Sequence, residues 1–158
     1  MSILAQITSW WSSFYGNHQI VSLVIRYLHL TVIVLAAGTA LFIDRQVWRA
    51  LRSGPPERES VLTMLTRSHP RVVPWLAVIA ATGVLMTAAE TSTFLASKLY
   101  WIKMALVAIL LANGLVMLAA ERRVGARAGW SRLAAISTIS AILWLVILFL
   151  GKLLTVAA

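Results

Sequence analysis

The chain has 158 residues, of which 60% are hydrophobic and only 12% are charged. Soluble domains carry about 25% charged and about 45–50% apolar residues, so this composition excludes an ordinary water-soluble enzyme and a disordered chain. It also argues against a nucleic-acid-binding module, despite a formal net charge of +9, and the lack of cysteine excludes a disulfide framework or a thiolate metal site.

The N-terminal segment, residues 1–18, carries no Lys, Arg, Asp or Glu, and its aromatic and aliphatic residues recur at helical spacing. It lacks the basic start of a cleavable signal peptide. An aromatic, apolar helix of this kind is typical of a segment lying in the membrane interface, here on the outer side. The alternative is a frayed tail that carries exposed tryptophans.

Four apolar stretches follow, at residues 21–43, 72–89, 99–120 and 133–150. A bilayer core about 30 Å thick is crossed by roughly 20 apolar residues in a helix. Small residues recur four apart in each stretch, which favours close helix packing in lipid. The sequence therefore predicts an all-α fold, an integral membrane four-helix bundle that forms a single transmembrane domain over residues 1–158.

Arginines between these stretches predict the orientation. Residues 44–71 contain six arginines and residues 121–132 contain four. The positive-inside rule then places both loops in the cytoplasm and both termini outside, which fits a multi-pass protein of the bacterial inner membrane. Gly and Pro predict a break at residues 52–58, then a short helix over residues 58–67, with Pro70 and Pro74 in the first turn of the second span.

Ionisable residues inside a membrane are costly and indicate function. His29 would lie about 6 Å and Lys103 about 10 Å outward of the bilayer midplane at the helical rise. An imidazole is a common axial ligand of heme, so His29 and Lys103 are candidate iron ligands of one heme b. Arg26 and Lys98, toward the outer surface, could neutralise its propionates. Alternatively, His29 hydrogen-bonds a neighbouring helix and Lys103 extends to the interface.

His69, in Ser68-His69-Pro70, would lie about 20 Å in depth from His29, so the two cannot share one iron. It could cap a helix, bind a lipid headgroup, or mark a second cofactor site for a quinone or another heme. Asp44 and Glu90 would lie at opposite membrane faces, which leaves no carboxylate pair, and no common hydrolase or phosphate-binding motif occurs.

Three short motifs carry a family resemblance: Tyr27-Leu28-His29-Leu30, Ser68-His69-Pro70-Arg71 followed by Thr82-Gly83, and Trp101-Ile102-Lys103. Their order resembles small bacterial four-helix membrane proteins, and is distantly similar to the membrane domain of copper-resistance protein D and to HemJ-type protoporphyrinogen oxidase. The resemblance covers residues 21–123 and implies a b-type heme held by His29 and Lys103.

The HemJ-type family has a Tyr-His pair after its lysine, where this chain has Ala112-Asn113, so the porphyrinogen-oxidising activity is not carried over.

These observations predict a cytochrome-like electron-transfer protein that binds heme b and exchanges electrons with a quinone or a partner protein. Two alternatives remain: an accessory or assembly subunit of a larger membrane complex, and a metal or small-solute permease. The expected partners are the lipid bilayer and other membrane proteins, including further copies of the chain, and not nucleic acid.

Overall fold

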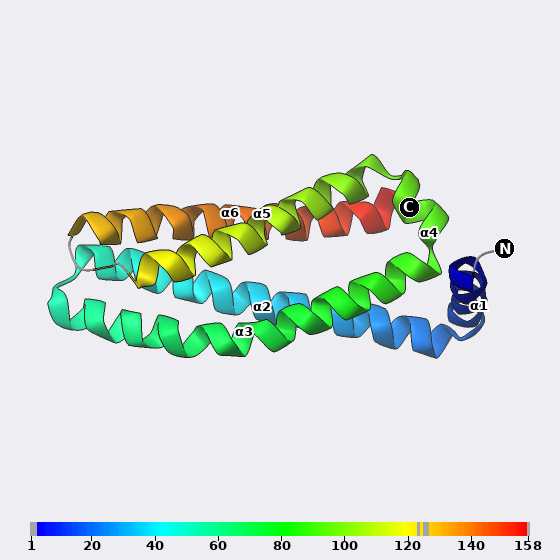
Figure 1. The fold of residues 1–158 in the computed structure, drawn as a ribbon, viewed down its shortest axis with the longest axis horizontal. Coiled ribbons are helices and arrows are strands. Elements are labelled where there is room, and N and C mark those ends of the chain that lie inside the picture. Colours follow the sequence, from blue (N-terminus) through cyan, green and yellow to red (C-terminus); the bar gives the residue numbers. More distant parts are fainter. Residues whose placement is uncertain (1–2, 123, 125–126, 158) are drawn as a thin grey trace. The chain divides into compact units, whose positions relative to one another are not determined.

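The computed structural model describes residues 3–122, 124 and 127–157. The described residues form helices and no strand, which confirms the all-α prediction (Figure 1). In chain order the helices are α1 (Ile3–Asn17), α2 (Gln19–Arg52), α3 (Pro55–Ala89), α4 (Thr91–Ala96), α5 (Lys98–Glu121) and α6 (Arg127–Ala157).

The chain forms two compact units. The first unit comprises Met1–Ala36 and Val72–Lys98, and the second unit comprises Ala37–Arg71 and Leu99–Ala158. The long helices α2 and α3 each contribute one part to each unit.

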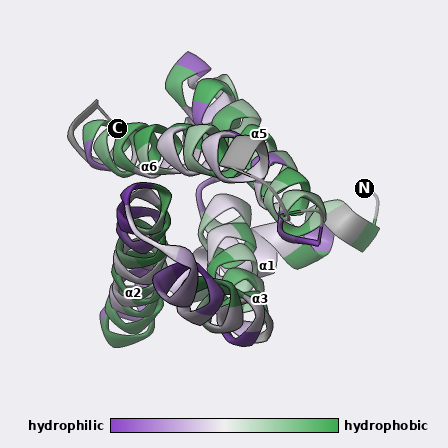
Figure 2. Cartoon of the chain, turned by 90° about the vertical axis from the view of Figure 1, so that its left-hand side faces the viewer, coloured by the Kyte–Doolittle hydropathy of each residue, from purple (hydrophilic) through white to green (hydrophobic). Residues whose placement is uncertain are grey.

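Four helices are long and apolar enough to cross a membrane: Gln19–Arg52, Val72–Ala89 within α3, Lys98–Glu121, and Gly129–Leu154 within α6. Each contains one of the four predicted stretches, so the chain is a multi-pass membrane protein by length and composition. Figure 2 shows hydrophobic residues over much of α5 and α6.

The turn between α2 and α3 is much shorter than the predicted loop over residues 44–71. Helix α2 continues to Arg52 and α3 begins at Pro55, so only Ser53 and Gly54 separate them. The pair Pro55-Pro56 occupies the first turn of α3, where a missing backbone N–H costs nothing.

The predicted position of Pro70 and Pro74 in a first turn is wrong, because α3 runs without interruption from Pro55 to Ala89. A proline inside a helix removes one backbone hydrogen bond, and packing in a membrane protein tolerates that loss. The predicted short helix over residues 58–67 is therefore the beginning of α3.

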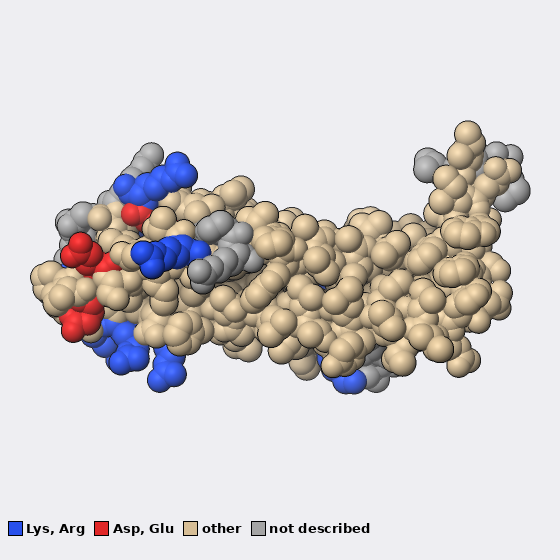
Figure 3. All heavy atoms as spheres, turned by 90° about the horizontal axis from the view of Figure 1, so that it is seen from below, with Lys and Arg blue, Asp and Glu red and all other residues tan. Residues whose placement is uncertain are grey.

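The second unit contains a packed core to which α6 contributes most. Leu133 on α6, Val47 on α2 and Leu65 on α3 are fully buried. Trp48 Nε1 donates to the Ala134 carbonyl at 3.2 Å, and Arg58 lies over the Trp130 ring, with 5.8 Å to its centroid. Charged side chains gather at the end of this unit that carries the α2–α3 turn (Figure 3).

The first unit is held together by contacts between α1 and α3. Trp11 Nε1 donates to the Leu85 carbonyl at 2.8 Å, and the Ser12 hydroxyl donates to the Ala89 carbonyl at 2.7 Å. The last four carbonyls of a helix lack partners within that helix, so Ser12 caps the carbonyl of Ala89 at the end of α3, and Trp11 adds a second contact one turn earlier. The N-terminal segment is thus a docked helix, and the alternative of a frayed tail is wrong.

Candidate functional site

His29 lies on α2 in the first unit, half-buried, with its ring against α3. Its Nδ1 is 2.7 Å from the hydroxyl oxygen of the buried Thr82. The same hydroxyl lies 2.7 Å from the carbonyl of Val78 and 3.1 Å from that of Ile79 on its own helix.

These distances indicate which atom donates in the contact between His29 and Thr82. A threonine hydroxyl has one hydrogen and two lone pairs, and the helix carbonyls can only accept. Since Thr82 donates its hydrogen to a carbonyl, its oxygen accepts from His29 Nδ1–H. A neutral imidazole with its proton on Nδ1 carries its lone pair on Nε2, which is the arrangement that metal-bound histidines commonly use.

Gly83 brings the backbone of α3 close to this ring. A Cβ added at Gly83 would lie 3.4 Å from His29 Cε1, at the limit of ordinary van der Waals contact. The absence of a side chain at Gly83 therefore lets the imidazole lie close to the backbone of α3.

Arg26, one helical turn before His29, is engaged by other residues of the first unit. Its Nε donates to the Tyr15 hydroxyl at 3.0 Å, and its guanidinium forms an ion pair with Glu90. The guanidinium also lies over the Tyr15 ring, with 5.7 Å to the centroid. Glu90 and Tyr15 were not predicted as partners of Arg26, because they lie 64 and 11 residues away in the sequence.

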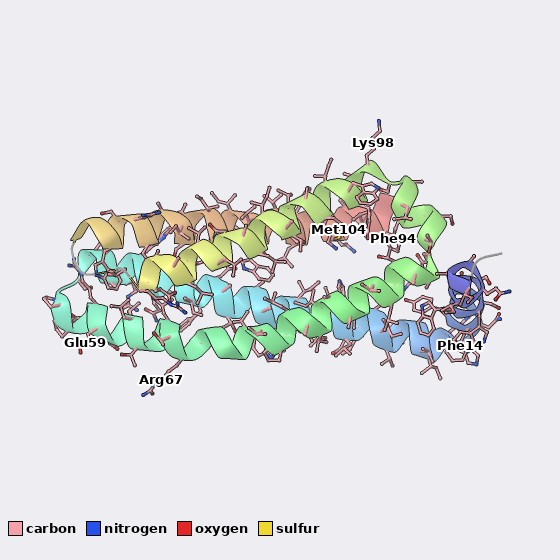
Figure 4. All side chains as sticks on the ribbon, in the orientation of Figure 1. Phe14, Glu59, Arg67, Phe94, Lys98 and Met104 are labelled. Atoms are coloured by element: carbon pink, nitrogen blue, oxygen red, sulfur yellow. The ribbon has the colours of Figure 1, made fainter. Side chains whose placement is uncertain are left out.

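The two lysines of the predicted site differ in environment. Lys103 is half-buried in the second unit, where a Cβ added at Gly151 on α6 would lie 3.6 Å from its Nζ. Lys98 is exposed and extends away from the ribbon (Figure 4). His29 belongs to the first unit and Lys103 to the second, so their joint binding of one iron stays a prediction.

His69 lies within α3, in the part that belongs to the second unit, and its side chain is outside the described residues. The suggested roles of His69 therefore stay predictions. In the described parts of the chain, no three His, Cys, Asp or Glu side chains come together in a way that could hold a metal ion.

Asp44 occupies a position that the sequence interpretation assigned to a membrane face. Helix α2 continues for two further turns past Asp44, and the Asp44 side chain is buried in the second unit, with only 4% of its surface exposed. Its position relative to the membrane stays a prediction. It faces Ser137 and Ser140 of α6, which are also buried. The sequence did contain an indication of this position, because the helical pattern continues without interruption from Asp44 to Arg52.

No protein-family model, curated protein or solved structure matches the chain.

Proposed function

We propose that the chain is an integral membrane heme protein of the b type, in which His29 Nε2 is an axial ligand of the iron. The observation that supports this most is the hydrogen bond between His29 Nδ1 and the Thr82 hydroxyl, because metal-bound histidines commonly make such a bond through the ring nitrogen that does not bind the metal.

The donor chemistry of the first unit fits this cofactor. A bound heme supplies one-electron oxidation and reduction. Thr82 orients the imidazole and makes it a stronger electron donor, and Gly83 leaves room for the ring to lie close to α3. Lys103, in the second unit, stays the second ligand that the sequence predicts.

Arg26 has a different role in this proposal from the one expected. Since it pairs with Glu90 and Tyr15, its charge is largely balanced within the protein. We therefore assign Arg26 to fixing the start of α2, with propionate binding as a secondary role. The electron partner would be a quinone or a membrane protein, and ten cytoplasmic arginines would set the orientation in a bacterial inner membrane.

Absorption spectroscopy of the chain purified from a heme-competent host tests this proposal. We expect a Soret band in the wild type and its loss in His29→Ala. The matched control is His18→Ala, because His18 is exposed and stacks on Phe14, with ring centroids 4.2 Å apart. A colourless wild type, or an unchanged band in His29→Ala, would contradict the proposal.

Thr82→Val tests the positioning role of the hydroxyl. The variant should keep its heme but show a raised reduction potential, because the imidazole loses the hydrogen bond that strengthens its donation to iron. Thr82→Ser retains the hydroxyl and should keep the wild-type potential. Equal potentials in all three proteins would remove Thr82 from the site.

A second candidate is an accessory subunit of a larger membrane complex. It is favoured by the sparse burial of the spans: only 11% of the most apolar stretch of α2 and 6% of that of α5 are buried. Such surfaces suit lipid as well as a partner helix. This candidate predicts a colourless protein that co-purifies in a defined ratio with another membrane protein.

A further inference from the structure

A buried polar cluster in the second unit joins α2 and α6. It consists of Asp44, Ser137 and Ser140, which are 4%, 0% and 8% exposed. The hydroxyls of Ser140 and Ser137 both interact with the Asp44 carboxylate. Even so, within the described residues Asp44 Oδ2 and Ser137 Oγ, both buried, have no hydrogen-bond partner of regular geometry.

The Asp44 carboxylate also has no cationic partner. Across the described part of the chain the structure contains the ion pair between Arg26 and Glu90 and none that involves Asp44. Burying an unpaired carboxylate is costly unless another charge or a proton neutralises it. An ionised Asp44 would therefore leave this cluster electrostatically incomplete.

The neighbouring polar groups are engaged elsewhere. Thr138 donates to the Ala134 carbonyl at 2.8 Å, and Asn113 Nδ2 donates to the Ile136 carbonyl at 3.3 Å. Helical serines commonly bond a carbonyl one turn back, as Thr138 does here. Ser137 does not, although it is completely buried, so its oxygen lone pairs remain for a ligand beside Asp44.

We propose that Asp44, Ser137 and Ser140 bind a sodium ion. Carboxylate and hydroxyl oxygens are hard ligands that suit hard cations. One carboxylate balances one positive charge, whereas sites for divalent calcium generally combine several carboxylates. A cation uses oxygen lone pairs and brings no hydrogen, so it satisfies both buried oxygens at once. The proposal involves none of the residues assigned to heme.

Thermal unfolding of the detergent-purified full chain tests this site. Sodium chloride would replace choline chloride at constant ionic strength. A ligand that binds only the folded state raises its stability, so sodium at ten times its Kd should raise Tm by roughly 3–6 °C. Potassium should give a smaller shift.

Substitutions locate the effect. Ser137→Ala and Ser140→Ala should each reduce the sodium-dependent shift, and Asp44→Asn should abolish it. Thr138→Ala is the matched control on α6, because its hydroxyl bonds its own helix, and should keep the full shift. The serine variants keep the test decisive if Asp44→Asn does not fold.

Three results would overturn the proposal. One is a Tm in sodium chloride equal to the Tm in choline chloride. Another is a sodium-dependent rise in Tm that is as large in the serine variants as in Thr138→Ala. The third is an infrared band of a protonated carboxylic acid, lost in Asp44→Asn and insensitive to sodium, which would show that a proton neutralises Asp44.

Discussion

The polar groups of the two units differ in how completely they are paired. In the first unit, His29 bonds Thr82, while Arg26 bonds both Glu90 and Tyr15. In the second unit, Asp44 lies in a better-packed region and yet has a buried oxygen without a regular hydrogen bond. Paired groups orient one another, as Thr82 orients His29, whereas a buried unpaired group indicates where a ligand completes the structure.

The two units also differ in packing. In the most apolar stretch of α6, in the second unit, 44% of the residues are buried, against 11% in Val72–Ala89 of the first unit. Lipid provides no hydrophobic drive for helix association, so close packing must supply the stability. We infer that most of the stability of the second unit depends on the inward face of α6.

The largest expected effect comes from opening a cavity in that face. Leu133→Ala removes a fully buried side chain and should lower the free energy of unfolding by about 2–5 kcal/mol. Leu145→Ala on the same helix, where Leu145 is 57% exposed, should have little effect. Thermal unfolding in detergent compares them, and similar losses would refute the unequal packing of the two faces.

A smaller effect is expected at the α2–α3 turn. Arg58 donates to the carbonyls of Ala50 and Leu51 and lies over Trp130. Arg58→Ala should therefore cost about 1–3 kcal/mol, measured by the same unfolding assay. Arg67, also on α3 but exposed and pointing away from the helix (Figure 4), provides the control, and Arg67→Ala should be nearly neutral. Equal costs would show that Arg58 does not secure the turn.

The smallest effect is expected in the first unit, at the ion pair between Arg26 and Glu90. Their side chains are 55% and 35% exposed, so solvent screens the pair. A double-mutant cycle with Arg26→Gln and Glu90→Gln should give a coupling of about 0.2–1 kcal/mol. The coupling should decrease as salt is added. A larger, salt-independent value would indicate that membrane lipids shield the pair.

Much of the fold could be predicted from the sequence, because a membrane span requires a long apolar run and little else. The four stretches, the helical N-terminal segment and the break near Gly54 all follow from local composition. The lengths of α2 and α3 could not be predicted in this way. Charged residues such as Asp44 and Arg49 were interpreted as part of a loop, although both lie in α2. Helix α4 was also missed, because Thr and Ser are poor predictors of helix.

The site could be predicted only in part. The rarity of ionisable residues in the membrane singled out His29, Arg26 and Lys103. Their partners are 53 residues away for His29 and 64 for Arg26, so no local pattern indicated them. Asp44 was missed for a related reason: its burial depends on where Ser137 and Ser140 of α6 pack.

The central claim is that His29 holds a heme, and a reduced-minus-oxidised difference spectrum of the purified chain tests it most directly. The account predicts the sharp bands of a b-type heme at one heme per chain, lost in His29→Ala and kept in His18→Ala. A flat difference spectrum in the wild type, or b-type bands of full size in His29→Ala, would contradict it.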